Sequence, residues 1–150
     1  MEVKQKIAEV FKTHNLMHIA TVDEDGLPKV RGVDFALSDQ ENVLYFVTRA
    51  ESNKVRQIRN NNNVHIAIDH DCPSMETLNQ LRYVKATGKA TIAETPEEAQ
   101  KIFGTLMQKF PFFAEIPGDP NSMLAVKVTL DKIVLNDNTV SFGHEEEVSY

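Results

Sequence analysis

Hydrophobic positions along this chain repeat with the period of a helix in three segments and with the period of a strand in most of the rest. The helical period covers residues 3–11, a two-turn segment that begins at Ser52, and residues 96–110, which end before Pro111. The sequence Thr-Pro-Glu-Glu at 95–98 supplies an N-cap, a proline at the first helical position and the second half of a capping box. We therefore predict three helices, of which the last is the longest.

Strands are predicted where apolar and polar residues alternate or where β-branched and aromatic residues cluster. Turn-forming residues separate them at 23–26 and 38–42, and the polar residues 71–80 are expected to form a loop. Gly88 interrupts the longest strand and marks a bulge or a bend there. The last eight residues are expected to form an acidic, solvated tail. The predicted strands cover residues 17–22, 29–37, 43–48, 64–69, 81–93, 123–130, 132–135 and 139–142.

The order of these elements favours one antiparallel sheet. The first three strands are joined by short turns, so we expect them to pair in a row, with Arg31, Val33 and Phe35 on one face of the second. None of the six glycines forms a Gly-rich turn between a strand and a helix, which argues against a nucleotide-binding parallel sheet. A small barrel would close so many short strands without exposed edges. No repeat or linker divides the chain, so residues 1–150 are expected to form a single domain.

Charge and composition narrow the possible functions. The formal net charge of −6 argues against a nucleic-acid-binding protein, which normally carries a basic face. No apolar run approaches the roughly 18 residues that cross a bilayer, and the first residues lack the apolar core of a signal peptide. The single cysteine, Cys72, cannot form an internal disulfide, so we expect the reducing cytoplasm as the compartment.

A candidate anion site lies where the second and third strands lead into the short helix. Arg31 projects from one strand, Thr48 ends the next, and Ser52, Asn53 and Lys54 open the helix. The first turn of a helix offers unpaired N–H groups and a partial positive charge, and hydroxyl and cationic side chains add further donors for a phosphate. The same residues also fit a simpler interpretation, in which the serine only caps the helix and the arginine is solvated or ion-paired.

Two further clusters contain residues that are capable of chemistry. His65 and residues 69–72 include metal-binding side chains, but their spacing fits no standard metal motif, so we expect a solvated loop and no metal. The aromatic run at 110–113 is expected in the core or at a subunit interface rather than around a ligand. No catalytic acid or base is identified from the sequence.

Five short blocks resemble successive motifs of the pyridoxamine 5'-phosphate oxidase-like family, whose members are split barrels that bind flavin mononucleotide (FMN). The resemblance is close over residues 1–69 and looser over the rest of the chain. It implies a mainly β, antiparallel, six-stranded Greek-key split barrel with flanking helices. The blocks are HIATV at 18–22, DGLP at 25–28, KVRGVDF at 29–35, LYFVT at 44–48 and SNKVRQI at 52–58.

The resemblance also implies the cofactor, the assembly and the site. FMN would lie at the interface of a homodimer, so that a monomer would have an incomplete site, and the flavin would act on a small-molecule substrate. The phosphate would be contacted by Arg31, Thr48, Ser52 and Lys54, with Asn53 beside them. The isoalloxazine ring would lie along the backbone of Gly32, Val33, Asp34, Phe46 and Val47.

The chain departs from pyridoxamine 5'-phosphate oxidase itself at its end. That enzyme is longer and ends in a segment containing Trp and Arg, whereas this chain has no Trp and ends in residues 141–150, with three consecutive glutamates. We therefore expect an FMN-dependent oxidoreductase with another substrate. The alternative is a split barrel that binds FMN, haem or a deazaflavin without turnover, because one fold can serve both purposes.

Overall fold

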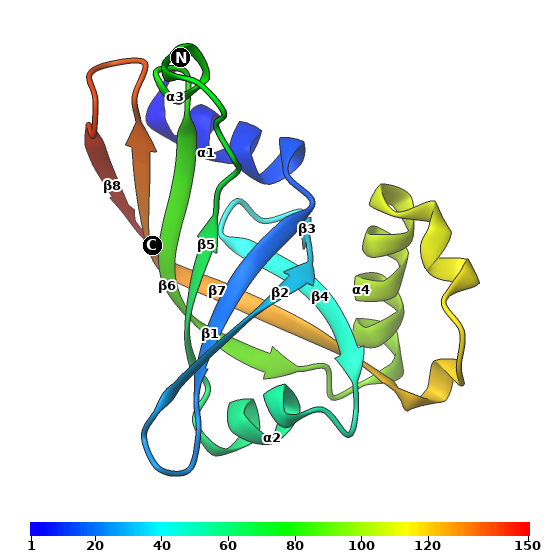
Figure 1. Ribbon diagram of the computed structural model, residues 1–150. Coiled ribbons are helices and arrows are strands. Elements are labelled where there is room, and N and C mark those ends of the chain that lie inside the picture. The colour runs from blue at the N-terminus through cyan, green and yellow to red at the C-terminus, as the bar shows by residue number, and fades with distance from the viewer.

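The structure is a computed structural model that describes residues 1–150, except for the side chain of residue 120. An antiparallel sheet of eight strands curls into a half-barrel flanked by helices (Figure 1), which confirms the predicted fold class. No helix in this description is both long and apolar enough to cross a bilayer. In chain order the elements are α1 (Val3–Thr13), β1 (Leu16–Val22), β2 (Pro28–Asp34), β3 (Ala36–Leu37), β4 (Val43–Arg49), α2 (Asn53–Asn60), β5 (Asn63–Ile68), α3 (Met75–Leu78), β6 (Arg82–Ile92), α4 (Pro96–Lys109), η1 (Pro111–Glu115), η2 (Pro120–Ser122), β7 (Met123–Asp137) and β8 (Glu145–Ser149).

The strands are hydrogen-bonded in the order β2-β1-β5-β6-β7-β4-β3, and β8 pairs with β7 outside this path. The arm that the sequence predicts as one strand over residues 29–37 is divided at Phe35. Residues up to Asp34 pair with β1, whereas Ala36 and Leu37 pair with β4. The predicted second strand thus pairs with both predicted neighbours, but through two segments that lie at opposite ends of the strand order. Phe35 is fully buried at the corner where the chain crosses from one end of the strand order to the other. The alternation continues through both halves, since Val33, Phe35 and Leu37 all face the barrel core.

Apolar cores lie on both faces of the curled sheet. The larger one fills the barrel with inward side chains such as Met17, Ile19 and Phe46. Helix α1 covers one end of the barrel and α2 the other, while α4 lies at the side (Figure 1). On the outer face of β4, Ile102 and Leu106 of α4 pack with Tyr45 in the second core. Strand β4 is therefore covered on both faces, and its successive residues face different environments.

Gly88 stands at the bulge that the sequence predicts in the long strand. The register of β6 against β7 shifts between Thr87 and Gly88. A Cβ atom at Gly88 would lie only 2.5 Å from the backbone oxygen of Thr129. Glycine is needed here because the two backbones approach too closely for any side chain.

The end of the chain differs from the prediction. Strand β7 is continuous where the sequence predicts two strands, and residues 139–142 form a turn instead of a strand. The predicted acidic tail supplies β8, which pairs with β7 so that Val148 lies opposite Ile133. Outward-facing Glu145 and Glu147 pair with lysines of the neighbouring strands. The strand was missed because its glutamates mask a short alternating pattern.

Two smaller local predictions are also corrected. Helix α4 begins at its predicted N-cap, where Thr95 Oγ1 accepts from the Glu98 backbone N–H at 3.2 Å. The Glu98 side chain, however, pairs with Lys127 at 3.6 Å and does not close a capping box. The predicted loop at 71–80 contains the one-turn helix α3, which Ser74 caps.

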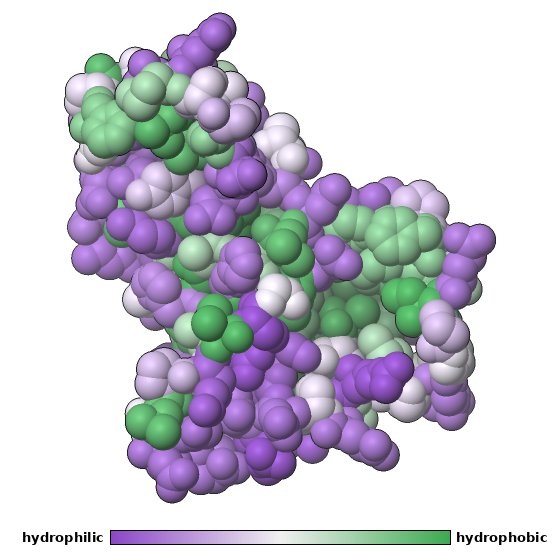
Figure 2. Space-filling view, in the orientation of Figure 1, coloured by the Kyte–Doolittle hydropathy of each residue, from purple (hydrophilic) through white to green (hydrophobic). Residues whose placement is uncertain are grey.

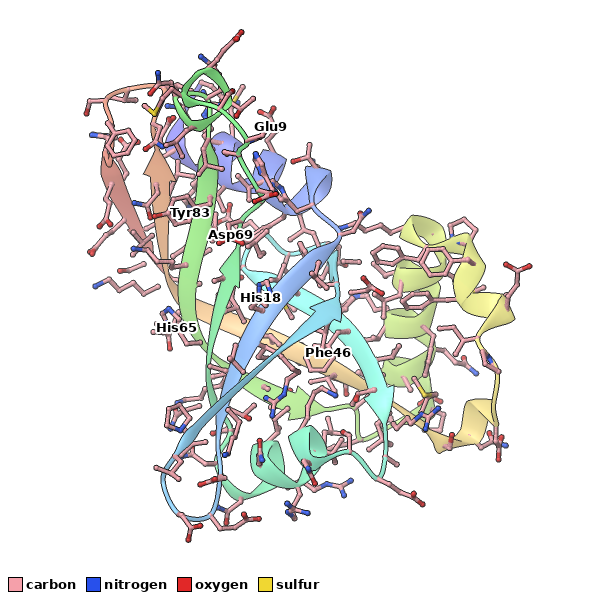
Figure 3. All side chains as sticks on the ribbon, viewed as in Figure 1. Glu9, His18, Phe46, His65, Asp69 and Tyr83 are labelled. Carbon is pink, nitrogen blue, oxygen red and sulfur yellow. The ribbon has the colours of Figure 1, made fainter. Side chains whose placement is uncertain are left out.

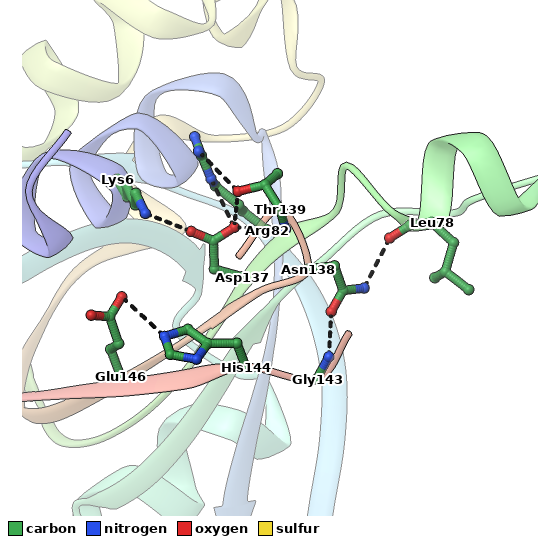
Figure 4. Close-up of polar contacts among 9 residues, drawn as sticks. All are labelled: Lys6, Leu78, Arg82, Asp137, Asn138, Thr139, Gly143, His144 and Glu146. Atoms are coloured by element: carbon green, nitrogen blue, oxygen red, sulfur yellow. Dashed lines mark hydrogen bonds and ion pairs between the residues drawn. The ribbon is translucent and has the colours of Figure 1, made fainter. Parts of the chain in front are cut away.

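A buried carboxylate anchors the turn between β7 and β8 (Figure 4). Asp137 is fully buried, and its oxygens accept from Lys6 Nζ at 2.7 Å, Arg82 Nε at 3.2 Å and the Thr139 hydroxyl at 2.5 Å. Burial alone would raise the pKa of Asp137, but these donors outweigh it and hold that pKa well below its ordinary value. The cluster ties α1, β6 and the turn together.

Candidate functional site

The candidate anion site lies at the end of the barrel that α2 closes. The inward faces of three strands lead to it, with Thr21 on β1, Arg31 on β2 and Thr48 on β4. Helix α2 begins where the sequence predicts, because Ser52 has extended backbone angles and its Oγ accepts from the Val55 N–H at 3.4 Å. The strands and the helix thus bring together side chains that are far apart in the sequence.

Hydroxyl groups and an ammonium group form a short chain of hydrogen bonds at the start of α2. Lys54 Nζ donates to Thr48 Oγ1 at 2.7 Å, and that oxygen lies 3.3 Å from Ser52 Oγ. Asn53 is exposed at the first position of the helix, beside them. We call Arg31, Thr48, Ser52 and Lys54 the anion cradle.

Two buried neutral side chains accept from the guanidinium of the anion cradle, and the backbone oxygens of Lys29 and Ile19 accept from its Nη1 at 3.3 and 3.5 Å. Arg31 Nη1 donates to Thr21 Oγ1 at 2.7 Å, and Nη2 donates to Gln57 Oε1 at 2.9 Å. The Thr21 hydroxyl donates in turn to Gln57 Oε1 at 2.6 Å. Thr21 is 1% exposed and Gln57 5%, so water competes little for these bonds. We call Thr21 and Gln57 the acceptor pair.

The electrostatics of the anion cradle favour a negatively charged ligand. Burial lowers the pKa of Arg31, and burial together with the nearby Arg31 charge lowers the pKa of Lys54. Neither cation forms an ion pair with a carboxylate in the described part of the chain. Two neighbouring cations without a counter-charge repel each other, and an anion between them would relieve this repulsion. This arrangement supports the anion-site interpretation over a merely structural cap.

The residues predicted beside a flavin ring lie on β2 and β4. Gly32 and Asp34 are exposed, while Val33 packs against the barrel core. The Phe46 side chain is fully buried inside the barrel (Figure 3), so only its backbone is available to a ligand. Val47 faces the opposite way, toward α4.

A cavity of about 580 Å³ lies on the outer face of β4. It is bounded by β4, α4 and the segment from η1 to the start of β7, and Figure 2 shows apolar surface in the hollow beside α4. Arg49 and Glu51 are charged residues of its wall. Because Thr48 belongs to the anion cradle and its neighbours Val47 and Arg49 face the cavity, one stretch of β4 serves both. The apolar part of the lining comprises Val47, Phe103, Met107, Phe113, Ala114, Ile116, Pro117 and Met123.

The candidate metal ligands do not converge. His65 on β5 and Asp69 just after it lie well apart (Figure 3), because four residues of extended chain span about 13 Å, which is too far for one ion. His70 instead contacts His14, with 2.8 Å between Nδ1 and Nε2. Within the described residues, no three His, Cys, Asp or Glu side chains are grouped for a metal.

Sequence reasoning missed the acceptor pair, although a signal for each member exists. Thr21 follows Met17 and Ile19 at every second position, so it lies on the inward face of β1. Gln57 lies three residues after Lys54 and next to buried Ile58, so it is a polar residue on the covered side of α2. A polar residue on an inward face needs a hydrogen-bond partner, and Arg31 is a suitable donor on the neighbouring strand.

A family model described as pyridoxamine 5'-phosphate oxidase matches residues 3–135 of the chain. The chain belongs to this family. Membership of the pyridoxamine 5'-phosphate oxidase family confirms the resemblance that the short sequence blocks indicate.

Several proteins are similar to this family member. General stress protein 26 of Bacillus subtilis is 31% identical over 109 residues, which are 73% of each protein. The crystal structure of general stress protein 26 from Bacillus anthracis aligns over 100% of both chains with a TM-score of 0.70 and 24% identity. A heme binding protein from Mycobacterium smegmatis aligns over 99% of this chain and 58% of its own, with a TM-score of 0.80 and 13% identity. The two structures show that the fold is shared.

Proposed function

We propose that this protein binds FMN and acts as an FMN-dependent oxidoreductase on a small-molecule substrate. The observation that carries the proposal is the pair of cations in the anion cradle. Arg31 is close enough to lower the pKa of Lys54, and neither cation has a carboxylate partner among the described residues. A phosphate dianion fits such a site, because it accepts several charge-assisted hydrogen bonds at once. Membership of the pyridoxamine 5'-phosphate oxidase family favours the phosphate of a flavin over other phosphates.

The residues of this chain would hold and orient the cofactor. The anion cradle would bind the phosphate, and the backbone of β2 at Gly32–Asp34 and of β4 at Phe46–Val47 would lie along the ring. Bound FMN supplies hydride or electron transfer. The anion cradle offers two cations and two hydroxyl groups to the phosphate, so its part in the proposal is binding and orientation. The single cysteine supports a cytoplasmic location.

The proposal includes a homodimer, because the cavity beside β4 is open and its surroundings are apolar. Met107 and Ile116 of the lining are 37% and 45% exposed, and neighbouring Phe112 is 54% exposed. A second copy that covered these side chains would remove them from water and enclose the cavity. The enclosed space would take a small, largely apolar substrate.

Haem is the alternative cofactor, because a similar structure is that of a heme binding protein. A haem iron usually needs a proximal His, Cys or Tyr side chain, and Met serves as a ligand together with His. The lining described for the cavity contains Met107 and Met123 but none of the three proximal residue types. The chemistry of the side chains thus favours FMN. A visible spectrum of protein loaded with each cofactor separates the two, since a Soret band would indicate haem.

The anion cradle is tested by titrating the protein with FMN and following the quenching of flavin fluorescence. Replacing Arg31 and Lys54 together by Ala should weaken binding at least about 100-fold, because each charge-assisted contact contributes about 1.5–3 kcal/mol. Arg56→Ala with Arg59→Ala is the matched control, since it removes two exposed cations from the same helix. The control should change the affinity less than about threefold. Equal affinity of the two double variants would refute the placement of the phosphate.

Catalysis is tested separately from binding. The FMN-loaded protein should oxidise a reduced nicotinamide in the presence of an electron acceptor. Flavin that stays bound without turnover across a panel of donors would favour a binding or sensing protein.

A further inference from the structure

We infer that Gln57 and Thr21 are positioning residues that aim the Arg31 guanidinium at the ligand phosphate. The inference rests on the proposed function and extends it. It states that the preference for a phosphorylated flavin depends on how Arg31 is held, and not on its charge alone. The acceptor pair does this from behind the anion cradle, without touching the ligand.

The geometry of the hydrogen bonds shows which edge of the guanidinium is left for a ligand. The acceptor pair occupies Nη1 and Nη2 at 2.7 and 2.9 Å, and the two acceptor oxygens lie only 2.6 Å apart. Arginine has five N–H donors in a rigid plane, of which Nε–H and the second Nη2–H lie along its side edge. That edge has no partner among the described residues. It is the edge that forms parallel hydrogen bonds to two oxygens of one phosphate.

The acceptors of the pair are neutral, which distinguishes them from the usual partners of a buried arginine. A carboxylate in their place would fix the guanidinium equally well but would cancel its charge, as Asp137 does for Lys6 and Arg82. The amide of Gln57 and the hydroxyl of Thr21 fix the orientation and leave the positive charge in place. The amide must turn its oxygen toward Arg31, because arginine can only donate.

The location of Gln57 explains how the orientation of the Arg31 guanidinium is maintained. It lies three residues after Lys54, so both side chains occupy the same side of α2. Lys54 reaches Thr48 on β4, while Gln57 reaches Arg31 on β2. One helix thus sets the two cations at a fixed separation across the end of the barrel. Without Gln57, Nη2 would lose its acceptor, and only the bonds of Nη1 to Thr21 and to the backbone would oppose the repulsion from Lys54.

The test compares FMN with riboflavin, which has the same ring and no phosphate. Affinities for both are measured by fluorescence quenching in the wild type and in the variants Gln57→Leu, Thr21→Val and Thr21→Ser. Gln57→Leu and Thr21→Val should each weaken FMN binding about tenfold or more, and riboflavin binding should stay within about twofold. Thr21→Ser keeps the hydroxyl and should restore FMN binding. Gln100→Leu makes the same chemical change at an exposed position of α4 and serves as the control.

The outcomes separate the role of the acceptor pair from the phosphate site of the proposed function. If Gln57→Leu weakens FMN and riboflavin binding equally, Gln57 has a general structural role and the inference is wrong. If the wild type prefers FMN through Arg31 but Gln57→Leu and Thr21→Val do not change that preference, the inference is wrong and the proposed function stands. If the wild type binds FMN no better than riboflavin, the phosphate site of the proposed function itself is wrong.

Discussion

The partly or fully buried charges at the two ends of this barrel have opposite kinds of partner. At the α2 end, Thr21 and Gln57 present neutral oxygens to Arg31, whose charge stays available. At the α1 end, the carboxylate of Asp137 is surrounded by cationic donors, which neutralise it. Removing one partner from a neutralised cluster destabilises the fold, because it leaves the others without a counter-charge. An unneutralised cluster leaves a charge for a ligand.

The depressed pKa of Asp137 predicts how stability depends on pH. Below the ordinary carboxyl pKa the unfolded chain takes up a proton that the folded protein resists, so the stability contributed by Asp137 is full near neutrality and is lost as the solution becomes acidic. Asp137→Asn should lower the free energy of unfolding by about 3 kcal/mol at pH 7. The difference from the wild type should shrink between about pH 5 and pH 2.

Urea unfolding at a series of pH values measures this difference. Asp39→Asn is the control, because Asp39 forms only an exposed pair with Lys101. A difference between wild type and Asp137→Asn that stays constant down to pH 3 would contradict the assignment.

Individual residues of the candidate site could be singled out from the sequence, whereas their hydrogen-bond partners could not. Arg31, Ser52 and Lys54 were found because helix capping and charge are local properties that a short segment reveals. The contact of Arg31 with Gln57 joins residues 26 positions apart, and it depends on how α2 docks against β1 and β2. Side-chain pairing of this kind is decided by the tertiary structure, so one sequence does not reveal it.

At the scale of elements, local pattern determined the type of each segment better than its partner. The three longer helices and most strands lie where periodicity places them, within a residue or two at their ends. The strand predicted over 29–37 alternates throughout, but closing the sheet divides it at Phe35 between two partners. Alternation reports which side chains face inward, and it carries no information on which strand lies alongside.

The bulge between β6 and β7 predicts a substitution that the fold does not tolerate. Gly88→Ala places a methyl group against the backbone oxygen of Thr129 and should destabilise the protein by about 1–3 kcal/mol. Gly104→Ala is the matched control, because no atom lies within 4 Å of its new methyl group. In the helix interior the control should stabilise by about 0.5–1 kcal/mol. Urea midpoints that move in the same direction for both variants would contradict this account of Gly88.

At the scale of the whole molecule, apolar surface remains beside the cavity after the barrel and α4 have packed. Phe112 contacts the rings of Phe110 and Phe113 along one edge and is otherwise exposed. The aromatic run at 110–113 divides its roles accordingly, since Phe110 is buried, Phe113 lines the cavity and Phe112 faces outward. This distribution supports the proposal that a second copy covers the cavity.

The proposed dimer is tested by sedimentation velocity. The wild type should sediment as a dimer, and Phe112→Glu should shift it toward the monomer because a charge would be buried at the interface. Phe142→Glu is the control, since Phe142 is 69% exposed in the turn before β8 and away from the cavity. A monomeric wild type, or equal dissociation of the two variants, would contradict the proposed interface.

The division of one strand at Phe35 has a consequence for the energetics of the ligand. Strands β2 and β4 meet at a seam of the barrel that no ladder of backbone hydrogen bonds crosses. Arg31 stands on one side of this seam and Thr48 on the other, so an anion held by both would act as a non-covalent cross-link where the sheet has none. Binding of the ligand would then raise the free energy of unfolding of the chain. A cofactor bound at this seam would therefore join the two strands of the barrel that form its own binding site.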